Sequence, residues 1–424
     1  MPSATATPSS PSRTVLVVGA GPAGLMAALA AGEAGARVTV LEAQPRPGLK
    51  LLASGGGRCN LGNVLEPAAF MARFGRDGRF LAPALQAFPP AAQRRWFAAH
   101  GVPVHAADGF HYFPVAESAR VVLDALLAEA RRLQVRFLFE TPVRALLRDP
   151  AAGNRVCGVQ TAAGELRADA VVLAAGGLGY PGLGGGAAGL ELARAAGHSV
   201  VPPVPGLAPL PVTEPWVAEC AGVVLNPARL RIALPGFPKA GIAGELLFTH
   251  QGLSGPVALD LSAAVAQALA GHPAGVPLQI AIRPDWDAAA WQAQLEHWRT
   301  HDGRKSLANL VDRLLPASLA GVVARLAGVA TLTAARLDRA ARDRLVALLT
   351  ALPVTVVRPA GWDRAMVMAG GVSRRETDPE TLESRWVPGL YLAGELLDVD
   401  GPCGGFNLTW AFASGRLAGR AAAA

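Results

Sequence analysis

The chain has 424 residues, of which 51% are hydrophobic and 17% are charged, and its formal net charge is +7. This composition excludes a largely disordered chain, because disordered segments are poor in apolar residues and rich in charge. The four cysteines include no Cys-x-x-Cys pair. That excludes a disulfide framework, a zinc ribbon and a thioredoxin-type redox site, and it predicts a cytoplasmic protein with no metal site.

The amino-terminal region predicts a disordered tail followed by a βαβ unit. Residues 1–13 are mostly Pro, Ser, Thr and Ala. The uncharged stretch at 14–32 resembles a signal peptide, but three glycines interrupt it. A β-branched run at 15–18, a small-residue helix at 25–34 and a second strand at 37–41 explain it better. We predict no membrane span here or elsewhere in the chain.

The turn of this unit has the pattern Gly-x-Gly-x-x-Gly, made by Gly19, Gly21 and Gly24 with Pro22 and Ala23 between the last two. In this motif the first glycine allows a tight turn, the second lets a pyrophosphate approach the backbone, and the third lets the helix pack on the sheet. The phosphates meet the N–H groups of the helix N-terminus. Glu42 ends the second strand, where a carboxylate hydrogen-bonds ribose hydroxyls. The motif predicts FAD or NAD rather than a 2′-phosphorylated cofactor.

A second glycine-rich segment begins at Lys50 and contains the sequence SGGGRCN at 54–60. Three successive glycines form a loop that can wrap closely around a cofactor, and Arg58 is a candidate phosphate or flavin contact. The alternative is a polar loop with no ligand. A disulfide-reductase mechanism is excluded, because no second cysteine lies five residues from Cys59.

The predicted type of secondary structure changes twice in the centre of the chain. Residues 68–133 predict mainly helices, and short apolar runs from 135 to 174 predict a β-meander. Gly177 to Gly182 repeats the Gly-x-Gly-x-x-Gly spacing after a strand, but no acidic residue lies near position 200. We interpret this segment as a loop that returns towards the cofactor, and not as a second nucleotide site.

From about Pro202 a proline-rich stretch leads into β-like runs and then into arginine-rich helices. The predicted fold class is therefore α/β, with a Rossmann-like domain in two chain segments. The predicted boundaries are 14–205 and 353–424 for this domain, 206–285 for an inserted β-rich module and 286–352 for an inserted helical module.

Two elements near the carboxyl end distinguish FAD from NAD. Gly394-Glu395 follows a strand, and Gly404-Gly405-Phe406-Asn407 opens a helix. An acidic side chain beside a glycine can hold a ribityl hydroxyl, and a helix N-terminus can stabilise negative charge on a reduced flavin. An NAD dehydrogenase needs no such second element, so the pattern predicts FAD.

Three motifs together resemble the BaiN-like, or YhiN-like, family of flavoproteins: SGGGRCN at 54–60, FTHxGLSGP at 248–256 and the long motif at 369–415. The resemblance covers nearly the whole chain from about residue 14. It implies a Rossmann-like FAD-binding domain interrupted by a β-barrel-like module and a helical module. The residues it places around FAD are Gly19, Gly21, Gly24, Glu42, Ser54, Gly55, Gly56, Gly57, Arg58, Cys59, Asn60, Gly394, Glu395, Gly404, Gly405, Phe406 and Asn407. We add Pro22, Ala23, Lys50, Asp398 and Gly401 as further predicted cofactor contacts.

The resemblance also implies an FAD-dependent oxidoreductase. Activities in the family include reduction of conjugated double bonds in 3-dehydro bile acids, formation of dihydrouridine in large-subunit ribosomal RNA and oxidation of aminoacetone. The first two share hydride transfer from reduced flavin N5 to an alkene carbon. We therefore predict C=C reduction fed by NAD(P)H as a transient hydride donor, with ribosomal-RNA uridine as the leading substrate and a small enone next. The alternatives are an amine oxidase that uses O₂ and a flavin-binding redox sensor.

Protonation of the second alkene carbon requires an acid near the flavin. The candidate donors are Cys59, His250 and Tyr180, with His111 and Tyr112 as weaker ones. Each leading candidate also has an explanation without a catalytic role. Cys59 can be a buried packing thiol, His250 a hydrogen-bonded structural histidine and Tyr180 an aromatic residue of a turn.

Arginine supplies nearly all of the positive charge. Residues 302–344 contain eight basic residues against four aspartates, and residues 73–136 contain nine arginines against five acids. Such segments suit phosphate contacts. The alternative is solvated helix faces that bind no nucleic acid.

Overall fold

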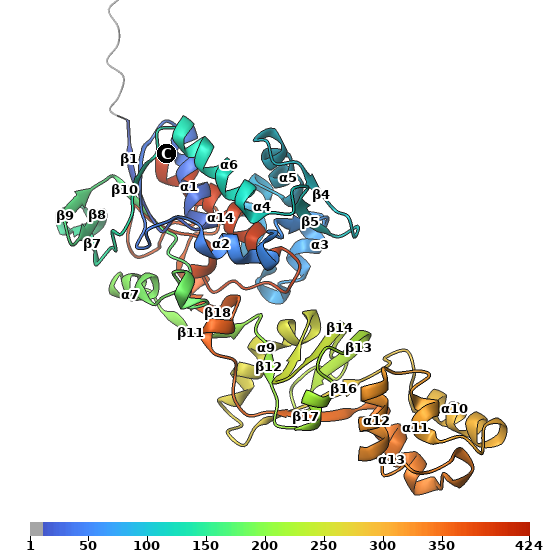
Figure 1. Cartoon of the computed structure of the whole chain (residues 1–424). Helices are drawn as coiled ribbons and strands as arrows, with labels where there is room; N and C mark the ends of the chain where they lie inside the picture. The colour runs from blue at the N-terminus through green and yellow to red at the C-terminus, as the bar shows by residue number, and fades with distance from the viewer. Residues whose placement is uncertain (1–11) are drawn as a thin grey trace, which may run out of the picture. The chain divides into compact units, whose positions relative to one another are not determined.

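The computed structural model describes residues 12–424, which form two compact units (Figure 1). The first unit contains the chain up to Pro203 together with Val367–Ala424, and the second contains Val204–Met366. The predicted tail at 1–13 lies outside the described residues except for its last two positions. Within residues 12–424 no helix combines the length and the hydropathy of a membrane-spanning segment.

A five-stranded parallel sheet forms the centre of the first unit, in the order β19-β10-β1-β2-β6. The strands are β1 (Thr14–Val18), β2 (Arg37–Leu41), β6 (Arg136–Leu138), β10 (Ala170–Leu173) and β19 (Leu390–Leu392). Nearly every residue of β1, β10 and β19 is buried, because both faces of a parallel sheet are covered. This explains why these strands are continuous apolar runs without alternation.

Helices α1 (Pro22–Glu33), α6 (Ala119–Arg132) and α14 (Phe406–Ala423) lie side by side in this unit (Figure 1). Helices α1 and α14 approach each other through small residues. A Cβ atom at Gly415 would lie 2.2 Å from the carbonyl oxygen of Ala23, and one at Gly419 would lie 2.1 Å from that of Ala27. Only glycine permits this approach, which joins the two ends of the chain in one domain.

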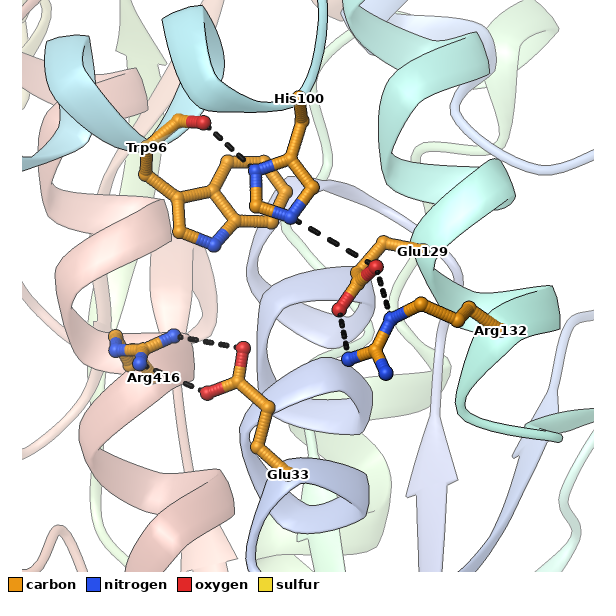
Figure 2. Close-up of polar contacts among 6 residues, drawn as sticks. All are labelled: Glu33, Trp96, His100, Glu129, Arg132 and Arg416. Carbon is orange, nitrogen blue, oxygen red and sulfur yellow. Dashed lines mark hydrogen bonds and ion pairs between the residues drawn. The ribbon is translucent and has the colours of Figure 1, made fainter.

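Ion pairs also connect the helices of the first unit, as Figure 2 shows. Glu33 of α1 pairs with Arg416 of α14 at 2.8 Å. The buried carboxylate of Glu129 in α6 pairs with Arg132 at 2.7 Å and lies 3.7 Å from His100, which follows α5 (Pro90–Ala99). The Arg132 guanidinium lowers the pKa of Glu129 below its ordinary value.

Several short elements complete the first unit. The helices are α2 (Leu49–Ala53), α3 (Pro67–Ala72), α4 (Ala82–Ala87) and α7 (Ala188–Ala195). One three-stranded sheet contains β3 (Gly62–Asn63), β4 (Val104–His105) and β5 (His111–Pro114). The other contains β7 (Ala145–Asp149), β8 (Arg155–Thr161) and β9 (Gly164–Arg167). The helical prediction for 68–133 missed β4 and β5. These strands are too short to show a period of two, and β5 pairs with β3 from another part of the chain.

The second unit contains a six-stranded antiparallel sheet in the order β12-β15-β14-β13-β16-β17. The strands are β12 (Leu210–Pro211), β13 (Val224–Ile232), β14 (Ile242–Thr249), β15 (Gly252–Ser254), β16 (Val276–Ala281) and β17 (Leu352–Val356). The two edge strands of this sheet are β12 and β17. Just after β12, the N–H of Thr213 donates to the carbonyl of Thr355 in β17 at 3.0 Å, and this bond between the two edges makes the sheet barrel-like.

Helices and sheet of the second unit share one apolar core, in which Leu230, Trp291 and Leu345 are fully buried. The helices are α8 (Trp216–Glu219), α9 (Pro256–Leu269), α10 (Ala288–His301), α11 (Leu307–Val311), α12 (Ala317–Leu326) and α13 (Arg339–Thr350). Strands β11 (Val200–Gly206) and β18 (Val367–Val372) pair with each other and carry the chain between the units. A Rossmann-like α/β domain interrupted by β-rich and helical parts is therefore the observed architecture.

Candidate cofactor site

The Gly-x-Gly-x-x-Gly turn joins β1 to α1 with no room for side chains at two of its glycines. Gly19 has a φ of 101°, and a Cβ there would lie 2.5 Å from the carbonyl oxygen of Ala174. A Cβ at Gly24 would lie 1.9 Å from the carbonyl oxygen of Gly19. Gly21 differs, because no atom of residues 12–424, its chain neighbours aside, lies within 4 Å of a Cβ placed on it.

This open space lies at the N-terminus of α1. Gly21 is the N-cap, no side chain caps the helix, and Pro22 occupies the first turn. The N–H groups of a first helical turn have no partner within the helix and favour an anion. The turn therefore fits a cofactor phosphate, with Gly21 as the position of closest approach.

Glu42 is fixed beside this turn by two hydrogen bonds. Its Oε2 accepts from the N–H of Ala20 at 2.7 Å, and its Oε1 accepts from the N–H of Gln44 at 2.8 Å. An ionised carboxylate oxygen accepts more than one hydrogen bond. Both oxygens therefore keep capacity for the ribose hydroxyls that the sequence motif predicts.

A second acidic residue, Glu395, lies where the C-terminal segment meets α1. It belongs to the short 3₁₀ helix η8 (Gly394–Leu396), and Lys50 Nζ donates to its two carboxylate oxygens at 2.9 and 2.7 Å. A Cβ at Gly394 would lie 2.7 Å from the Cβ of Ala23. Lys50, Gly394 and Glu395 thus gather beside the Gly-x-Gly-x-x-Gly turn, although Lys50 and Glu395 lie 345 positions apart in the sequence.

The glycine loop of residues 54–60 has a left-handed backbone over most of its length. Gly55, Gly56 and Gly57 have φ values of 57°, 67° and 87°, and Cys59 has a φ of 65°. A side chain is rarely found in this conformation, which explains the run of glycines. Ser54 Oγ donates to the carbonyl of Leu51 at 2.6 Å and holds the start of the loop.

The start of α14 is held by side chains on both sides. The amide of Asn407 bonds both the N–H and the carbonyl of Gly401, each at 2.8 Å. The Asn60 amide, oriented by its network, donates to Gly62 at 2.9 Å and accepts from the N–H of Gly405 at 3.2 Å. Gly405 is the N-cap, and no side chain caps α14. A second helix N-terminus in this unit is therefore free to face a ligand.

The two helix N-termini are spaced for an elongated cofactor. Helix α14 crosses the first turn of α1 at Gly415, where its backbone nearly touches Ala23. From Gly415 back to Phe406 the helix runs nine residues, or about 14 Å at 1.5 Å per residue. A phosphate at α1 and a flavin ring at the start of α14 are therefore compatible with one FAD molecule.

The side chains of three predicted cofactor-binding residues already bond to other groups of the protein. Asp398 accepts from Arg374 at 3.0 Å, and Arg374 also pairs with Asp77. Burial raises the pKa of Asp398, and the proximity of Arg374 partly opposes this. Asn407 and Asn60 use their amides to fix the loops around Gly401 and Gly405. Asn407 and Asn60 therefore shape the site through the backbone that they hold, and Asp398 is part of an ion-pair network.

The three leading candidates for the proton donor lie in different surroundings. Cys59 is fully buried, and burial raises the pKa of its thiol to about 12. Tyr180 is half-buried with a φ of 54°, and its carbonyl accepts from the N–H of Leu183. His250 lies between β14 and β15 in the second unit, where it is exposed. The donor role of each stays a prediction.

A cavity of about 350 Å³ opens beside the glycine loop. Its lining residues are Arg58, Asn60, Ala107, Asp108, His111, Phe113 and Glu117. Arg58 Nη1 lies 3.3 Å from Glu117 Oε2, and its guanidinium lies 4.6 Å from the centre of the Phe113 ring. This cavity is in the same unit as the glycine motifs, and Arg58 and Asn60 of the glycine loop line it.

The sequence reasoning missed several supporting residues. Asn63 is fully buried and donates to the carbonyl of Gly404 at 2.8 Å. Ser414 Oγ accepts from the N–H of Gly394, and Trp410 Nε1 donates to the carbonyl of the same glycine. Neither residue had a local signal, because α14 contains other polar residues, such as Asn407 and Thr409, and the partner of Asn63 lies 341 positions away.

Comparisons with known proteins concern the family and the fold of the whole chain. A family model described as the HI0933-like protein Rossmann domain matches residues 13–421. The chain is 34% identical to a 3-dehydro-bile acid delta(4,6)-reductase from Clostridium scindens, over 96% of this chain and 98% of the relative. It is 31% identical to a ribosomal RNA dihydrouridine synthase from Escherichia coli, over 94% of this chain and 95% of the relative.

Two solved structures share the fold. A flavocytochrome c3 fumarate reductase in an open conformation aligns with a TM-score of 0.51 at 19% identity, over 98% of this chain and 79% of the other. A 3-ketosteroid delta1-dehydrogenase from Sterolibacterium denitrificans aligns with a TM-score of 0.52 at 13% identity, over 97% and 99%. With the family match, these likenesses confirm the predicted fold class, an α/β Rossmann-like FAD-binding domain with inserted modules.

Proposed function

Because the chain belongs to the HI0933-like family and is an FAD-dependent oxidoreductase, we propose that it reduces a carbon–carbon double bond conjugated to a carbonyl group. The observation that carries this proposal is the similarity to a bile-acid reductase over 96% of the chain. The substrate named for that relative and the uracil ring of uridine share such a double bond. The resemblance to a dihydrouridine synthase therefore supports the same reaction.

In this proposal each part of the first unit has a defined task toward FAD. The N-terminus of α1 at Gly21 binds the pyrophosphate, and Glu42 binds a ribose. Lys50 and Glu395 hold the ribityl chain, and the N-terminus of α14 faces the flavin ring, where it stabilises negative charge. Bound FAD supplies a hydride at flavin N5. The protein orients the alkene beside that atom and provides a proton.

The hydride donor in this proposal is NAD(P)H, which visits the flavin without a nucleotide-binding domain of its own. Anaerobic stopped-flow mixing of the FAD-loaded protein with NADPH and with NADH tests this. We expect one of them to bleach the flavin absorbance. Bleaching by aminoacetone with peroxide formation, and none by NAD(P)H, indicates an amine oxidase instead. No bleaching by any of these donors indicates a flavin-binding sensor.

Two substrates fit the reaction class. Uridine in large-subunit ribosomal RNA is supported by the Escherichia coli relative, and a small enone is supported by the Clostridium scindens relative. Mass spectrometry of nucleosides from large-subunit RNA, with and without this gene, separates them. Loss of a dihydrouridine that the intact gene restores identifies the RNA. An unchanged dihydrouridine content in a host that has this modification excludes the RNA and leaves a small enone or an amine as the substrate.

A further inference from the structure

The cavity beside the glycine loop contains a histidine and a carboxylate whose arrangement is suited to proton transfer. His111 Nδ1 lies 2.5 Å from Asp108 Oδ2. Asp108 Oδ1 also accepts from the N–H groups of Phe110 and His111, at 2.9 and 2.8 Å. These hydrogen bonds hold the pKa of Asp108 well below its usual range, so the carboxylate is ionised at neutral pH.

This contact defines the proton positions of the His111 ring. An ionised carboxylate accepts, so Nδ1 must carry a hydrogen, and in the neutral ring Nε2 is then the unprotonated nitrogen. Protonation of the ring adds its second hydrogen at Nε2. Asp108 therefore fixes the orientation of the ring and makes Nε2 the atom that gains and loses a proton.

Nε2 lies close to the start of α14. A Cβ placed on Gly404 would lie 3.5 Å from His111 Nε2, which is an ordinary van der Waals distance. Gly404 precedes Gly405, the uncapped N-terminus of α14. The His111 side chain is 35% exposed and the Asp108 side chain 53% exposed, so water can return a proton to the ring.

We propose that His111, oriented by Asp108, donates the proton to the substrate in this cavity. The inference rests on the proposed function, in which hydride from reduced FAD adds to the β-carbon of the conjugated alkene. The π bond breaks, its electron pair moves to the α-carbon, and the Nε2–H bond breaks as its proton bonds that carbon. The substrate gains two hydrogens, FAD returns to its oxidised form, and the neutral imidazole takes a proton from water.

Cys59 is less suited to this step. A general acid works best when its pKa lies near the working pH, whereas the Cys59 thiol is fully buried with a pKa of about 12. His105 provides a matched control for His111. It also pairs with a carboxylate, Glu117, at 3.0 Å, but it does not line the cavity.

The test uses dithionite-reduced, FAD-loaded protein mixed anaerobically with two probes, a 3-oxo-Δ4,6 bile acid and a uridine-containing fragment of large-subunit RNA. We expect His111→Gln to slow flavin reoxidation by about 10²–10⁴-fold, the usual contribution of a general acid. The FAD content of the His111→Gln variant, and the rate at which its flavin is reduced, should stay within twofold of the wild-type values. His105→Gln should match wild type in all three measurements.

A second readout requires neither FAD nor substrate. Long-range ¹H–¹⁵N spectra of the histidine rings, assigned through His111→Gln, should show the Nδ1–H tautomer for neutral His111, and Asp108→Asn should alter it. An Nε2–H tautomer in the wild type overturns the inference, as does a His111→Gln variant that reoxidises at the wild-type rate. Failure of both probes to reoxidise the wild type contradicts the proposed function instead, and the tautomer then tests only whether Asp108 orients the His111 ring.

Discussion

Glu42 combines two tasks at a single residue, because its carboxylate holds the backbone of the turn and is also the proposed ribose partner. A charged hydrogen bond contributes about 1.5–3 kcal/mol, which corresponds to roughly 10- to 100-fold in affinity. We therefore expect Glu42→Ala to lower the affinity for FAD by at least this factor. The ratio of flavin to protein absorbance after purification measures the effect.

The control for this variant is Glu33→Ala, at the other end of α1, where the carboxylate pairs with Arg416. That variant should retain FAD at the wild-type ratio. A Glu42→Ala protein that is isolated fully yellow contradicts the assignment of Glu42 to the ribose.

Cys59 illustrates how a residue that is prominent in a motif can serve packing. Its side chain is fully buried in a left-handed segment of the loop. We expect Cys59→Ala to retain FAD and to change the rate of flavin reoxidation by less than tenfold. A hundredfold loss in reoxidation, with flavin reduction unchanged, would instead identify Cys59 as the proton donor.

At the scale of elements, the packing of α1 on α14 depends on glycine. A Cβ at Gly415 would overlap the backbone of Ala23, and overpacking typically costs about 1–3 kcal/mol. Gly321 of α12 is also a helical glycine, but nothing lies within 4 Å of its added Cβ. There alanine should stabilise the helix by about 1 kcal/mol, because it has the higher helix propensity.

We therefore expect opposite signs, with Gly415→Ala lowering and Gly321→Ala raising the midpoint of the thermal transition of its own unit. Scanning calorimetry measures both transitions. A Gly415→Ala variant as stable as wild type would show that the two helices are not in close contact.

The carboxylate of Glu129 gives a pH dependence to the stability of the helices in Figure 2. Hydrogen bonding from Arg132 lowers the folded-state pKa of Glu129, so its contribution is present above the ordinary glutamate pKa. It is lost as the pH falls through the lowered value. We expect Glu129→Gln to be less stable than wild type by about 1 kcal/mol at pH 7.

Urea unfolding at several pH values tests this sign. The difference between Glu129→Gln and wild type should shrink towards zero as the pH falls below the folded-state pKa of Glu129. A difference that is constant from neutral to acidic pH would show that the carboxylate charge is not responsible.

Elements with a strong local signal were predictable from the sequence, and those defined by distant partners were not. The β1–α1–β2 unit combines an apolar run, a glycine turn and a small-residue helix, so it could be placed closely. Strand β5 has no such pattern and forms by pairing with β3. In the same way, the prediction of a cofactor site from the glycine motifs depends on local patterns, whereas the proximity of His111 to Gly404 depends on distant parts of the chain.

At the scale of the whole molecule, the arginine-rich segment at 302–344 has fewer unpaired basic side chains than its composition suggests. Most of its basic residues pair with carboxylates, among them Lys305 with Asp302, Arg325 with Glu219, and Arg342 with Asp343. Within the described residues, Arg304, Arg336 and Arg344 form no ion pair, and Arg344 Nε donates to the carbonyl of Ala327 at 3.2 Å. Arg304 and Arg336 are therefore the best candidates for phosphate contacts.

If ribosomal RNA is the substrate, replacing Arg304 and Arg336 by alanine should weaken RNA binding and reduce its salt dependence, since each lost phosphate contact lowers the slope by about 1. Arg299→Ala, whose guanidinium already pairs with Glu296, should have little effect. Turnover of a small enone should be unchanged by either variant. Equal binding of RNA by all variants at every salt concentration would remove these arginines from substrate recognition.

The central claim is that electrons pass from this flavoprotein to a conjugated C=C bond. Dithionite-reduced protein mixed anaerobically with the bile-acid probe and with the RNA probe tests it directly, with flavin absorbance followed and products analysed by mass spectrometry. We predict that one probe reoxidises the flavin and gains two hydrogens. A flavin that stays reduced with both probes, and is reoxidised only by O₂, would contradict the account.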